Sequence, residues 1–232
     1  MYALFLKRAI DFSLSLLAMI ILSPVFFVLI IMGVVVMRGN PFFVQPRPGK
    51  KDRNGKEIIF MLFKYRTMSD LKDQNGELLP DNVRLNSYGK FLRATSLDEL
   101  PELLNIVKGD MAIVGPRPQL VRDMVFMTDE QRRRHDVRPG LTGLAQINGR
   151  NNITWERKLD YDLQYINSGI RLSSDFRILM KTCVKVFRRE DIVREGTASD
   201  IDFGDWLLQN STISHEEYEA KQRLAKDLLM GR

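Results

Sequence analysis

The sequence is poor in the residues that most often carry metal and redox chemistry. Among 232 residues there is one cysteine, Cys183, and there are two histidines. A single cysteine excludes an intrachain disulfide and a thiolate-rich metal site, and it fits a reducing cytosol better than secretion. His135 has no neighbours at metal-ligand spacing, so we interpret it as a structural residue.

The usual signatures of nucleotide and nucleic-acid recognition are also missing. No G-x-G-x-x-G follows a predicted strand, so a dinucleotide-binding loop is not expected. There is no aromatic-and-basic stripe and no recognisable nucleic-acid motif. The formal net charge of +6 suits an anionic partner, whether nucleic acid, an anionic membrane face or a phosphorylated substrate. The charge alone does not choose among them.

One long apolar run is present, from Ala9 to Met37, and no second one follows it. Its exceptions are Asp11, a few serines and Pro24. On length alone the run predicts an ordinary transmembrane helix. A signal peptide fits less well, because the run is too long and no small-residue cleavage site follows it.

Two features favour instead a helix hairpin that enters and leaves one leaflet. Ser23 and Pro24 lie in the middle, and proline removes a backbone N–H and clashes with the preceding turn, so we expect a break there. Each half, about fifteen residues, then spans roughly 22 Å, which is short of the roughly 30 Å bilayer core. A span also requires charge asymmetry, whereas basic residues flank both ends: Lys7, Arg8, Arg38, Arg47, Lys50, Lys51 and Arg53.

This interpretation makes two local predictions. The Ser23 hydroxyl should bind a backbone group that Pro24 leaves without its partner. Asp11 should lie near the membrane interface, against Lys7 or Arg8.

The rest of the chain predicts a helix-rich α+β fold, without the alternation of a doubly wound sheet. Short strands are expected at Phe42–Gln45, Glu57–Tyr65 and Met111–Val114, with a polar surface excursion at 70–85 and a glycine-punctuated loop at 138–150. Helices are expected at 89–94, Leu97–Val107 (ending at Gly109), Thr128–Arg134, Ile153–Ile166, Ser173–Arg188 and Ser214–Leu229. We divide the chain into a re-entrant membrane helix (1–40), a small domain (41–190) and a C-terminal extension (191–232).

The last predicted helix is amphipathic. Ser214 and Glu217 have capping-box spacing, and the apolar side chains of Tyr218, Leu224, Leu228 and Leu229 lie roughly on one side. This helix either packs on the domain or a partner subunit, or lies on a membrane interface.

The segment from Arg93 to Pro101 carries the most suggestive local chemistry, an Asp98-Glu99 pair. Proline is tolerated in the first turn of a helix, so we expect a helix to begin near Asp98. One interpretation makes Asp98 an N-cap and Glu99 a first-turn acid favoured by the helix dipole. A functional interpretation uses the same geometry, because a carboxylate can attack phosphorus and an adjacent one can hold Mg²⁺ on a diphosphate.

Basic residues lie in Gly/Pro-rich turns next to apolar strands. Each alone is consistent with a solvated surface charge, but this placement favours phosphate binding, for which the arginine fork is suited. These candidates are Lys64, Arg66, Arg93, Arg117, Arg138 and Arg150. Asp160 and Asp162 lie two residues apart on a predicted helix and face different directions, so at most one is expected at a site with Tyr165.

Several motifs that are weak individually occur together over nearly the whole chain up to about residue 190. They are Lys7-Arg8, Ser23-Pro24, Phe63 through Met68, Arg93 through Leu104, Val114 through Pro118, Arg138 through Gly143, Gln146 through Arg150 and Tyr161-Asp162 to Tyr165. With these motifs in this order, the chain resembles the bacterial sugar transferase family, specifically its small monotopic phosphoglycosyl transferases. The region after Asp191 matches nothing that we can assign.

The resemblance implies a ping-pong reaction. Asp98 would attack the β-phosphate of a UDP-sugar, expel UMP and form a covalent phosphosugar enzyme. Polyprenyl phosphate, usually undecaprenyl phosphate, would then take the phosphosugar, in the first membrane step of glycoconjugate assembly. Glu99 would bind Mg²⁺, while Lys64, Arg93 and Arg117 would hold phosphates. Asp162 matches an acidic family position near the site, which favours it over Asp160.

The resemblance also implies a place in the cell and a set of partners. The chain would be monotopic in the bacterial inner membrane, with a catalytic domain and interface-associated helices on the cytoplasmic face. Its partners would be a UDP-sugar, polyprenyl phosphate and membrane lipids, with a homodimer left open; the sugar cannot be read from the sequence.

Two other functions compete. A membrane-bound scaffold with basic loops on lipid headgroups would need neither Asp98 nor a metal, and a nucleic-acid-binding module is disfavoured by the membrane hairpin, so no nucleic-acid partner is expected.

Overall fold

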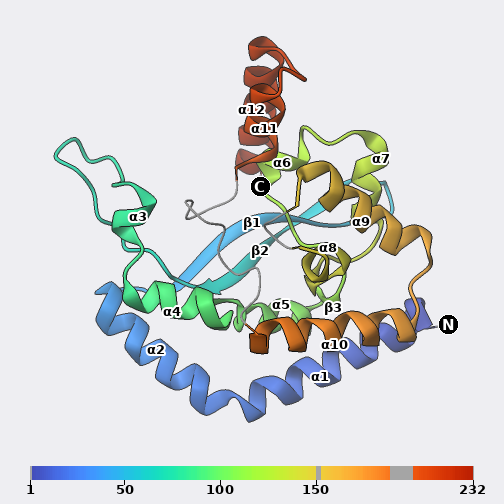
Figure 1. The fold of residues 1–232 in the computed structure, drawn as a ribbon, viewed down its shortest axis with the longest axis horizontal. Coiled ribbons are helices and arrows are strands. Elements are labelled where there is room, and N and C mark those ends of the chain that lie inside the picture. Colours follow the sequence, from blue (N-terminus) through green and yellow to red (C-terminus); the bar gives the residue numbers. More distant parts are fainter. Residues whose placement is uncertain (1, 150–152, 189–200, 232) are drawn as a thin grey trace.

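The structure, a computed structural model that describes residues 2–149, 153–188 and 201–231, is a helix-rich α+β fold. Helices α1 (Lys7–Ile21) and α2 (Ser23–Met37) run along one side of the molecule, and α12 (His215–Met230) projects from the opposite side (Figure 1). Short strands and helices fill the space between them. The predicted fold class, helix-rich with a few short strands, is confirmed.

The elements between these helices are mostly short. In chain order they are β1 (Phe42–Lys51), β2 (Glu57–Tyr65), α3 (Asp81–Arg84), α4 (Ser87–Thr95), the 3-10 turn η2 (Leu97–Glu99), α5 (Glu102–Lys108), β3 (Ala112–Val114), α6 (Val121–Met124), α7 (Asp129–Arg132), η3 (Arg133–Asp136), β4 (Gly140–Thr142), α8 (Leu144–Ile147), α9 (Trp155–Asn167), α10 (Leu172–Arg188) and α11 (Phe203–Gln209). A π-helical turn, η1 (Tyr2–Leu6), precedes α1.

The apolar run is broken where the sequence predicts. The axes of α1 and α2 differ by 65°, and Pro24 lies in the first turn of α2. The Ser23 hydroxyl donates to the carbonyl oxygen of Ile20 at 2.8 Å, which is the group that residue 24 would bind if it had an N–H. Among the described residues, no helix is long and apolar enough to cross a membrane alone, although the bent pair together meets that criterion by length and composition.

Helix α1 buries a polar stripe against the domain. Lys7, Asp11 and Ser15 are spaced four residues apart, so they share one face, and all three are buried. The Lys7 ammonium lies 2.6 Å from the carboxylate of Asp175 in α10 and 4.0 Å from Asp11, which accepts a 3.2 Å hydrogen bond from the N–H of Ile113. The expected contact of Asp11 with Lys7 is confirmed, and Asp11 is in addition buried against β3.

The other faces of α1 and α2 expose apolar side chains. Phe12, Leu17, Ile20, Ile21, Phe27, Val28, Ile31 and Val35 are each more than two-fifths exposed. Arg8 closes the end of α5 by donating to the carbonyl oxygens of Ile106 and Val107 at 2.5 and 2.8 Å, groups that lack partners within a helix. The bent pair is therefore joined to the domain by these polar contacts together with apolar packing from residues such as Met19, Phe26 and Leu29, and it presents its remaining apolar side chains outward.

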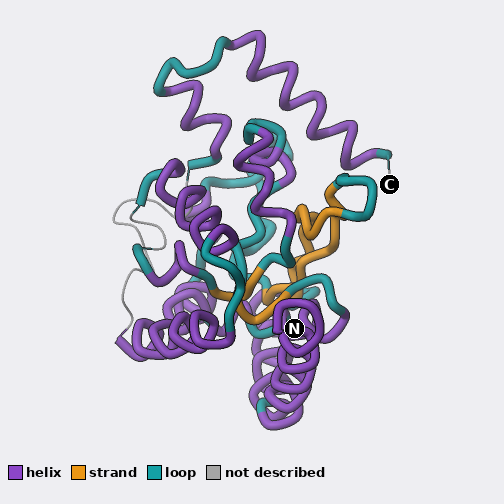
Figure 2. Tube along the Cα trace, turned by 90° about the vertical axis from the view of Figure 1, so that its right-hand side faces the viewer, coloured by secondary structure: helices purple, strands orange, loops and turns teal. Residues whose placement is uncertain are grey.

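Strands β1 and β2 form an antiparallel hairpin through the middle of the molecule (Figures 1 and 2). β2 has its predicted bounds, but β1 continues to Lys51 instead of ending at Gln45. The prediction was too short because Pro46 and Pro48 indicate a loop. They are tolerated because this sheet has two strands, each of them an edge where a missing N–H can face away from the partner.

The predicted strand Met111–Val114 is confirmed as β3, but the sequence analysis missed the strand that pairs with it. The segment 138–150, expected to be a loop, contains β4, which pairs in parallel with β3, and the helix α8. A Cβ atom added to Gly140 would lie 2.1 Å from the backbone nitrogen of Gly115. Glycine at this position therefore serves close backbone packing and not only loop flexibility.

The long C-terminal helices agree well with the sequence. α9, α10 and α12 begin and end within one or two residues of their predicted bounds. The hydroxyl of Ser214 accepts a 3.1 Å hydrogen bond from the N–H of Glu217, as expected of a helix N-cap. The predicted helix at 89–94 is α4, and that at 128–134 is α7 followed by η3.

Helices α11 and α12 share an apolar core with the domain. Phe203 of α11 packs with Trp155 and Phe126, and Tyr218 and Leu228 of α12 pack against this cluster. This side of α12 therefore packs on the domain, which is one of the two interpretations of the last helix. Because α12 lies at the opposite end from α1 and α2 (Figure 1), it does not share an interface plane with them.

Asp123 joins the C-terminal extension to the domain. Its buried carboxylate accepts hydrogen bonds from the N–H groups of Leu120, at 3.1 Å, and Phe203, at 2.8 Å. Burial outweighs these bonds and raises the pKa of Asp123 to about 6.

The raised pKa predicts a pH-dependent stability. The folded state binds this proton more tightly than the unfolded chain, so the contribution is complete below about pH 4 and is lost as the pH rises through about 6. Asp123→Asn keeps an acceptor oxygen and cannot ionise. The quantity to follow is the free energy of unfolding of Asp123→Asn minus that of wild type. We expect this difference to become more positive by on the order of 2–3 kcal/mol between about pH 4 and pH 7.5. Chemical denaturation in detergent measures it. The exposed Asp160→Asn is the control, and a pH-independent difference for Asp123→Asn would contradict the assignment.

Candidate active site

Asp98 and Glu99 lie in a short 3-10 turn and not at the start of a long helix. The predicted helix Leu97–Val107 is divided, since η2 ends at Glu99 and α5 begins at Glu102. Ser96 and Pro101 occupy the two N-cap positions, so the interpretation of Asp98 as an N-cap is wrong. Ser96 has a φ of 55°, a left-handed conformation that turns the chain sharply after α4.

The Glu99 carboxylate connects three segments of the chain. Its Oε1 accepts a hydrogen bond from Nζ of Lys64, at the end of β2, at 3.1 Å. The same oxygen accepts from Nη2 of Arg117, in the loop after β3, at 2.5 Å. Lys64 also lies 3.1 Å from the fully buried carboxylate of Glu102. Three predicted site residues, Lys64, Glu99 and Arg117, are therefore held together by ion pairs with little solvent screening.

Asp98 lies beside these ion pairs and is partly exposed. Burial, followed by the charge of Glu99, raises the pKa of Asp98, whereas Lys64, Arg117 and Arg93 act in the opposite direction. The Nε of Arg93 donates to the hydroxyl of Thr67 at 3.1 Å, which directs α4 toward the end of β2. The structure thus assembles two adjacent carboxylates and three cations, an arrangement able to receive phosphate groups.

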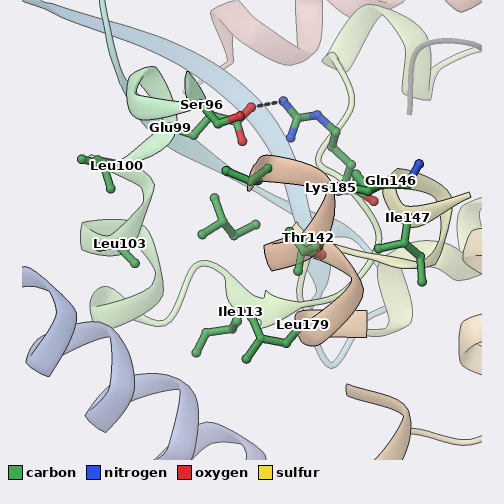
Figure 3. A pocket seen from close by; sticks show the side chains of 14 residues that line it. Ser96, Glu99, Leu100, Leu103, Ile113, Thr142, Gln146, Ile147, Leu179 and Lys185 are labelled. Atoms are coloured by element: carbon green, nitrogen blue, oxygen red, sulfur yellow. Dashed lines mark hydrogen bonds and ion pairs between the residues drawn. The ribbon is translucent and has the colours of Figure 1, made fainter. Parts of the chain in front are cut away.

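A pocket of about 190 Å³ adjoins Glu99 and Arg117. In Figure 3, Ser96 and Glu99 lie at one end, while Leu100, just after η2, and Leu103 of α5 lie opposite Thr142 and Leu179. Apolar side chains from α5, β3, β4, α8 and α10 form most of the wall. Both polar atoms of the Gln146 side chain are buried and have no hydrogen-bond partner in the described part of the chain.

Other predicted residues lie elsewhere. Arg66 pairs with Asp70 at the start of the surface excursion. The Nε of Arg138 donates to the carbonyl oxygen of Gly109 at 2.7 Å, which places Arg138 at the far end of α5. The hydroxyl of buried Tyr165 donates to Oδ1 of Asp175 at 2.8 Å, a contact between α9 and α10. Their expected phosphate-binding role receives no support from these contacts, and Arg150 lies outside the described residues.

Asp162 acts on the site through another residue. Its Oδ2 accepts from Nη2 and Nε of Arg134 at 2.6 and 3.0 Å, and both side chains are almost fully buried. The same Nη2 of Arg134 donates to the carbonyl oxygen of Arg117 at 2.7 Å. The Arg134–Asp162 pair therefore fixes the main chain at Arg117, the residue whose side chain binds Glu99. Asp160, the alternative considered from the sequence, is exposed.

Sequence reasoning missed Glu102 and Arg134. Glu102 lies three residues after Glu99, a helical spacing that gave a usable signal. Arg134 ends the run Arg132-Arg133-Arg134, which is typical of a solvated surface, and nothing in the local sequence distinguishes its buried side chain. Its partner Asp162 lies 28 residues away, so the pairing depends on how η3 packs against α9.

Among the described residues, no group of three or more His, Cys, Asp or Glu side chains is arranged to bind a metal ion. Mg²⁺ does not require such a group, because it keeps several waters and commonly binds through one or two carboxylates and substrate phosphates. The adjacent carboxylates of Asp98 and Glu99 fit a cation of that kind, arriving with a diphosphate.

The Arg134–Asp162 pair makes a stability prediction. Asp162→Asn removes one partner of a buried ion pair and leaves a charge uncompensated, which typically costs about 3–5 kcal/mol. Denaturation of Asp162→Asn should show a loss of this size, against a change within about 0.5 kcal/mol for the exposed Asp160→Asn on the same helix. The double variant Arg134→Met/Asp162→Asn should recover part of the loss, since no buried charge remains. If the stability losses of the two single substitutions simply add in the double variant, the pairing of Arg134 with Asp162 is contradicted.

Comparisons with known proteins agree with this picture. Residues 2–189 match the family model described as bacterial sugar transferase. A protein of Bacillus subtilis (strain 168), described as the uncharacterized sugar transferase EpsL, is 44% identical over 191 residues, which cover 81% of this chain and 90% of the relative.

Two further relatives are larger proteins with named reactions. The UDP-glucose:undecaprenyl-phosphate glucose-1-phosphate transferase of Klebsiella pneumoniae is 37% identical over 78% of this chain, and the undecaprenyl-phosphate galactose phosphotransferase of Salmonella typhimurium (strain LT2) is 34% identical over 80%. The chain spans 40% and 41% of their lengths. Because the family match extends over most of the sequence and includes the carboxylate pair and its cations, the chain belongs to the bacterial sugar transferase family.

Proposed function

We propose that this protein transfers a sugar phosphate from a UDP-sugar to a polyprenyl phosphate, undecaprenyl phosphate in bacteria, and releases UMP. The observation that carries the proposal is the pair Asp98 and Glu99, surrounded by Lys64, Arg93 and Arg117. Cations in this arrangement match the oxygens of a diphosphate. The names of the Klebsiella and Salmonella relatives, which act with undecaprenyl phosphate, support the same reaction class.

Asp98 is the proposed nucleophile. A carboxylate oxygen of Asp98 attacks the β-phosphorus of the UDP-sugar, the bond from that phosphorus to the bridging oxygen breaks, and UMP leaves with the electron pair. An oxygen of the polyprenyl phosphate then attacks the same phosphorus. The aspartyl–phosphorus bond breaks, the carboxylate is restored, and the product is a polyprenyl diphosphate-sugar. Lys64, Arg93 and Arg117 stabilise the charge that develops on the phosphoryl oxygens.

Glu99 is the proposed ligand of Mg²⁺. The bound cation would neutralise the diphosphate and polarise its oxygens. Without it, Glu99 holds Lys64 and Arg117 in place. Glu99 would therefore contact both the phosphate-binding side chains and the metal ion on the diphosphate, so that all three are held close together.

The bent helix pair is the proposed membrane anchor. Its exposed side is apolar, and its break leaves halves that are each too short to cross the bilayer core. The outward side of α10 adds exposed Phe176, Met180 and Val184, as expected of a helix at a membrane interface. Polyprenyl phosphate is itself confined to the membrane, so this anchor places the site where the acceptor is found. The proposed location is the cytoplasmic face of the bacterial inner membrane, where UDP-sugars are available.

The mechanism predicts a covalent intermediate. In a screen of UDP-sugars with Mg²⁺ and no acceptor, the correct donor should give one UMP per site and add the mass of a phosphosugar to a peptide containing Asp98. Asp98→Asn should fold and lose nearly all turnover, because an amide does not form this bond. Glu99→Gln should abolish activity or raise the Mg²⁺ requirement, since a neutral amide is a poor ligand for a hard cation. Asp129→Asn, at an exposed aspartate, is the matched control.

The outcome that contradicts the covalent route is specific. If UMP appears only when polyprenyl phosphate is present, and no adduct is found, then the transfer is direct. Full transfer activity of Asp98→Asn would exclude Asp98 as the nucleophile, and a wild-type protein that releases no UMP from any UDP-sugar, even with polyprenyl phosphate, would favour a lipid-binding scaffold.

The anchor predicts a topology. In a Cys183→Ser background, Ala3→Cys and Lys50→Cys should both resist an impermeant thiol reagent in intact cells and react after permeabilisation. Labelling of Ala3→Cys without labelling of Lys50→Cys in intact cells would show that the segment spans the membrane, and it would contradict the re-entrant hairpin.

A variant of the helix break provides the matching test. Ser23→Ala/Pro24→Ala restores the N–H that pairs with Ile20, so α1 and α2 join into one helix of roughly 45 Å, long enough to cross the bilayer. We expect residue 3 to become accessible in a fraction of these molecules. Unchanged protection would show that the break does not decide the topology.

A further inference from the structure

The pocket beside Glu99 has walls that do not suit a nucleotide sugar. Most of its exposed lining is apolar and comes from residues such as Leu100, Leu103, Ile113, Leu141, Leu179 and Val186. Glu99 and Ser96 lie at one end (Figure 3), where Arg117 is hydrogen-bonded to Glu99. Thr142, Gln146, Thr182 and Lys185 add a few polar groups elsewhere in the wall. One end of this pocket therefore belongs to the phosphate site, and the rest of its surface is mainly apolar.

The pocket shares its wall with the proposed membrane anchor. Four of its residues also pack in one apolar cluster with Ala18 and Met19 of α1 and Phe26 of α2; they are Leu100, Leu103, Ile113 and Leu141. On its other side the wall is α10, whose residues Phe176, Met180 and Val184 are exposed. The pocket thus lies one layer of side chains away from the apolar surface that the anchor and α10 present.

We propose that this pocket binds the first isoprene unit of the polyprenyl phosphate, with the phosphate of that acceptor at the Arg117 end. The inference rests on the proposed function and adds the acceptor subsite to it. The UDP-sugar carries polar groups along its whole length, and the few polar side chains of the wall, among them Thr142 and Gln146, are too few to pair with most of them. The acceptor joins a phosphate directly to a hydrocarbon chain, which matches a pocket with a cation at one end and apolar walls.

The size of the pocket agrees with this assignment. An apolar cavity of roughly 150 Å³ holds benzene, so about 190 Å³ accommodates one five-carbon isoprene unit. The remainder of the chain does not fit inside. It lies instead along the apolar surface of α1, α2 and α10, within the membrane.

A narrowed pocket tests the proposal by kinetics. Leu179→Trp fills the pocket from α10, and Leu224→Trp, at an exposed leucine of α12 on the opposite side of the molecule, is its matched control. For Leu179→Trp we expect the UMP burst without acceptor to stay within about twofold of wild type, and the KM for undecaprenyl phosphate to rise about tenfold or more. Leu224→Trp should change neither. Equal KM values for the two variants would overturn the proposal, as would loss of the UMP burst in folded Leu179→Trp.

Photolabelling tests the subsite without any turnover. A polyprenyl phosphate with a diazirine on its first isoprene unit should label peptides that contain Leu103 or Leu179 in the wild-type protein. Undecaprenyl phosphate should compete, and phosphatidylglycerol should not. Labelling confined to the outer faces of α1 and α2, or equal competition by phosphatidylglycerol, would overturn the assignment. If no UDP-sugar releases UMP while the pocket is still labelled, the proposed reaction fails and the lipid subsite stands.

Discussion

The arrangement of the site depends on one carboxylate. Glu99 accepts hydrogen bonds from Lys64 and Arg117, and these residues belong to a strand end and to a loop more than fifty positions later in the chain. Each partner is held independently as well, since Lys64 reaches Glu102 and the main chain at Arg117 is bound by Arg134. A buried ion pair is costly to assemble unless its geometry is supported from several sides. That support is what permits Asp98, immediately before Glu99, to have a defined position next to three cations.

A second constraint places this site relative to the bent helix pair. Helix α1 would be expected to turn apolar residues toward a protein core, yet its buried stripe is Lys7, Asp11 and Ser15. Asp175 accepts from Lys7 at 2.6 Å, from Tyr2 at 2.7 Å and from Tyr165 at 2.8 Å, so one carboxylate joins the start of the chain to α9 and α10. Polar contacts of this kind have few alternative registers, unlike sliding apolar contacts. The position of Asp98 and Glu99 relative to the outward apolar surface of the bent pair is therefore set by contacts within the protein.

The features that the sequence predicted correctly are those with local causes. The break at Ser23-Pro24 follows from a missing N–H, the end of α5 at Gly109 from its left-handed φ of 97°, and the cap at Ser214 from its own hydroxyl, which accepts from an N–H three residues later. What the sequence did not predict has non-local causes. Strand β4 exists because Gly140 packs against the backbone of Gly115. Arg138 was a candidate as an arginine in a glycine-rich turn and Tyr165 as a neighbour of Asp162, and each contacts a partner in another segment that the sequence did not indicate. The assignment of Asp98 and Glu99 to chemistry came from a pattern of motifs over the whole chain, because the local geometry alone was equally consistent with helix capping.

Charge balance relates the structure of the site to the proposed use of a metal ion. Asp98, Glu99 and Glu102 lie among Lys64, Arg93 and Arg117, so the negative and positive side chains are equal in number when all are ionised. Such a cluster is tolerable when buried because it is nearly neutral, although burial still raises the pKa of Glu102. In the proposed reaction, a UDP-sugar would add the charges of its two phosphates, for which this set of cations, already paired, has no surplus. A divalent cation held by Glu99 would balance that added charge and would leave Arg117 and Lys64 to bind phosphate oxygens. The same balance would explain how a site with so few metal ligands could use Mg²⁺.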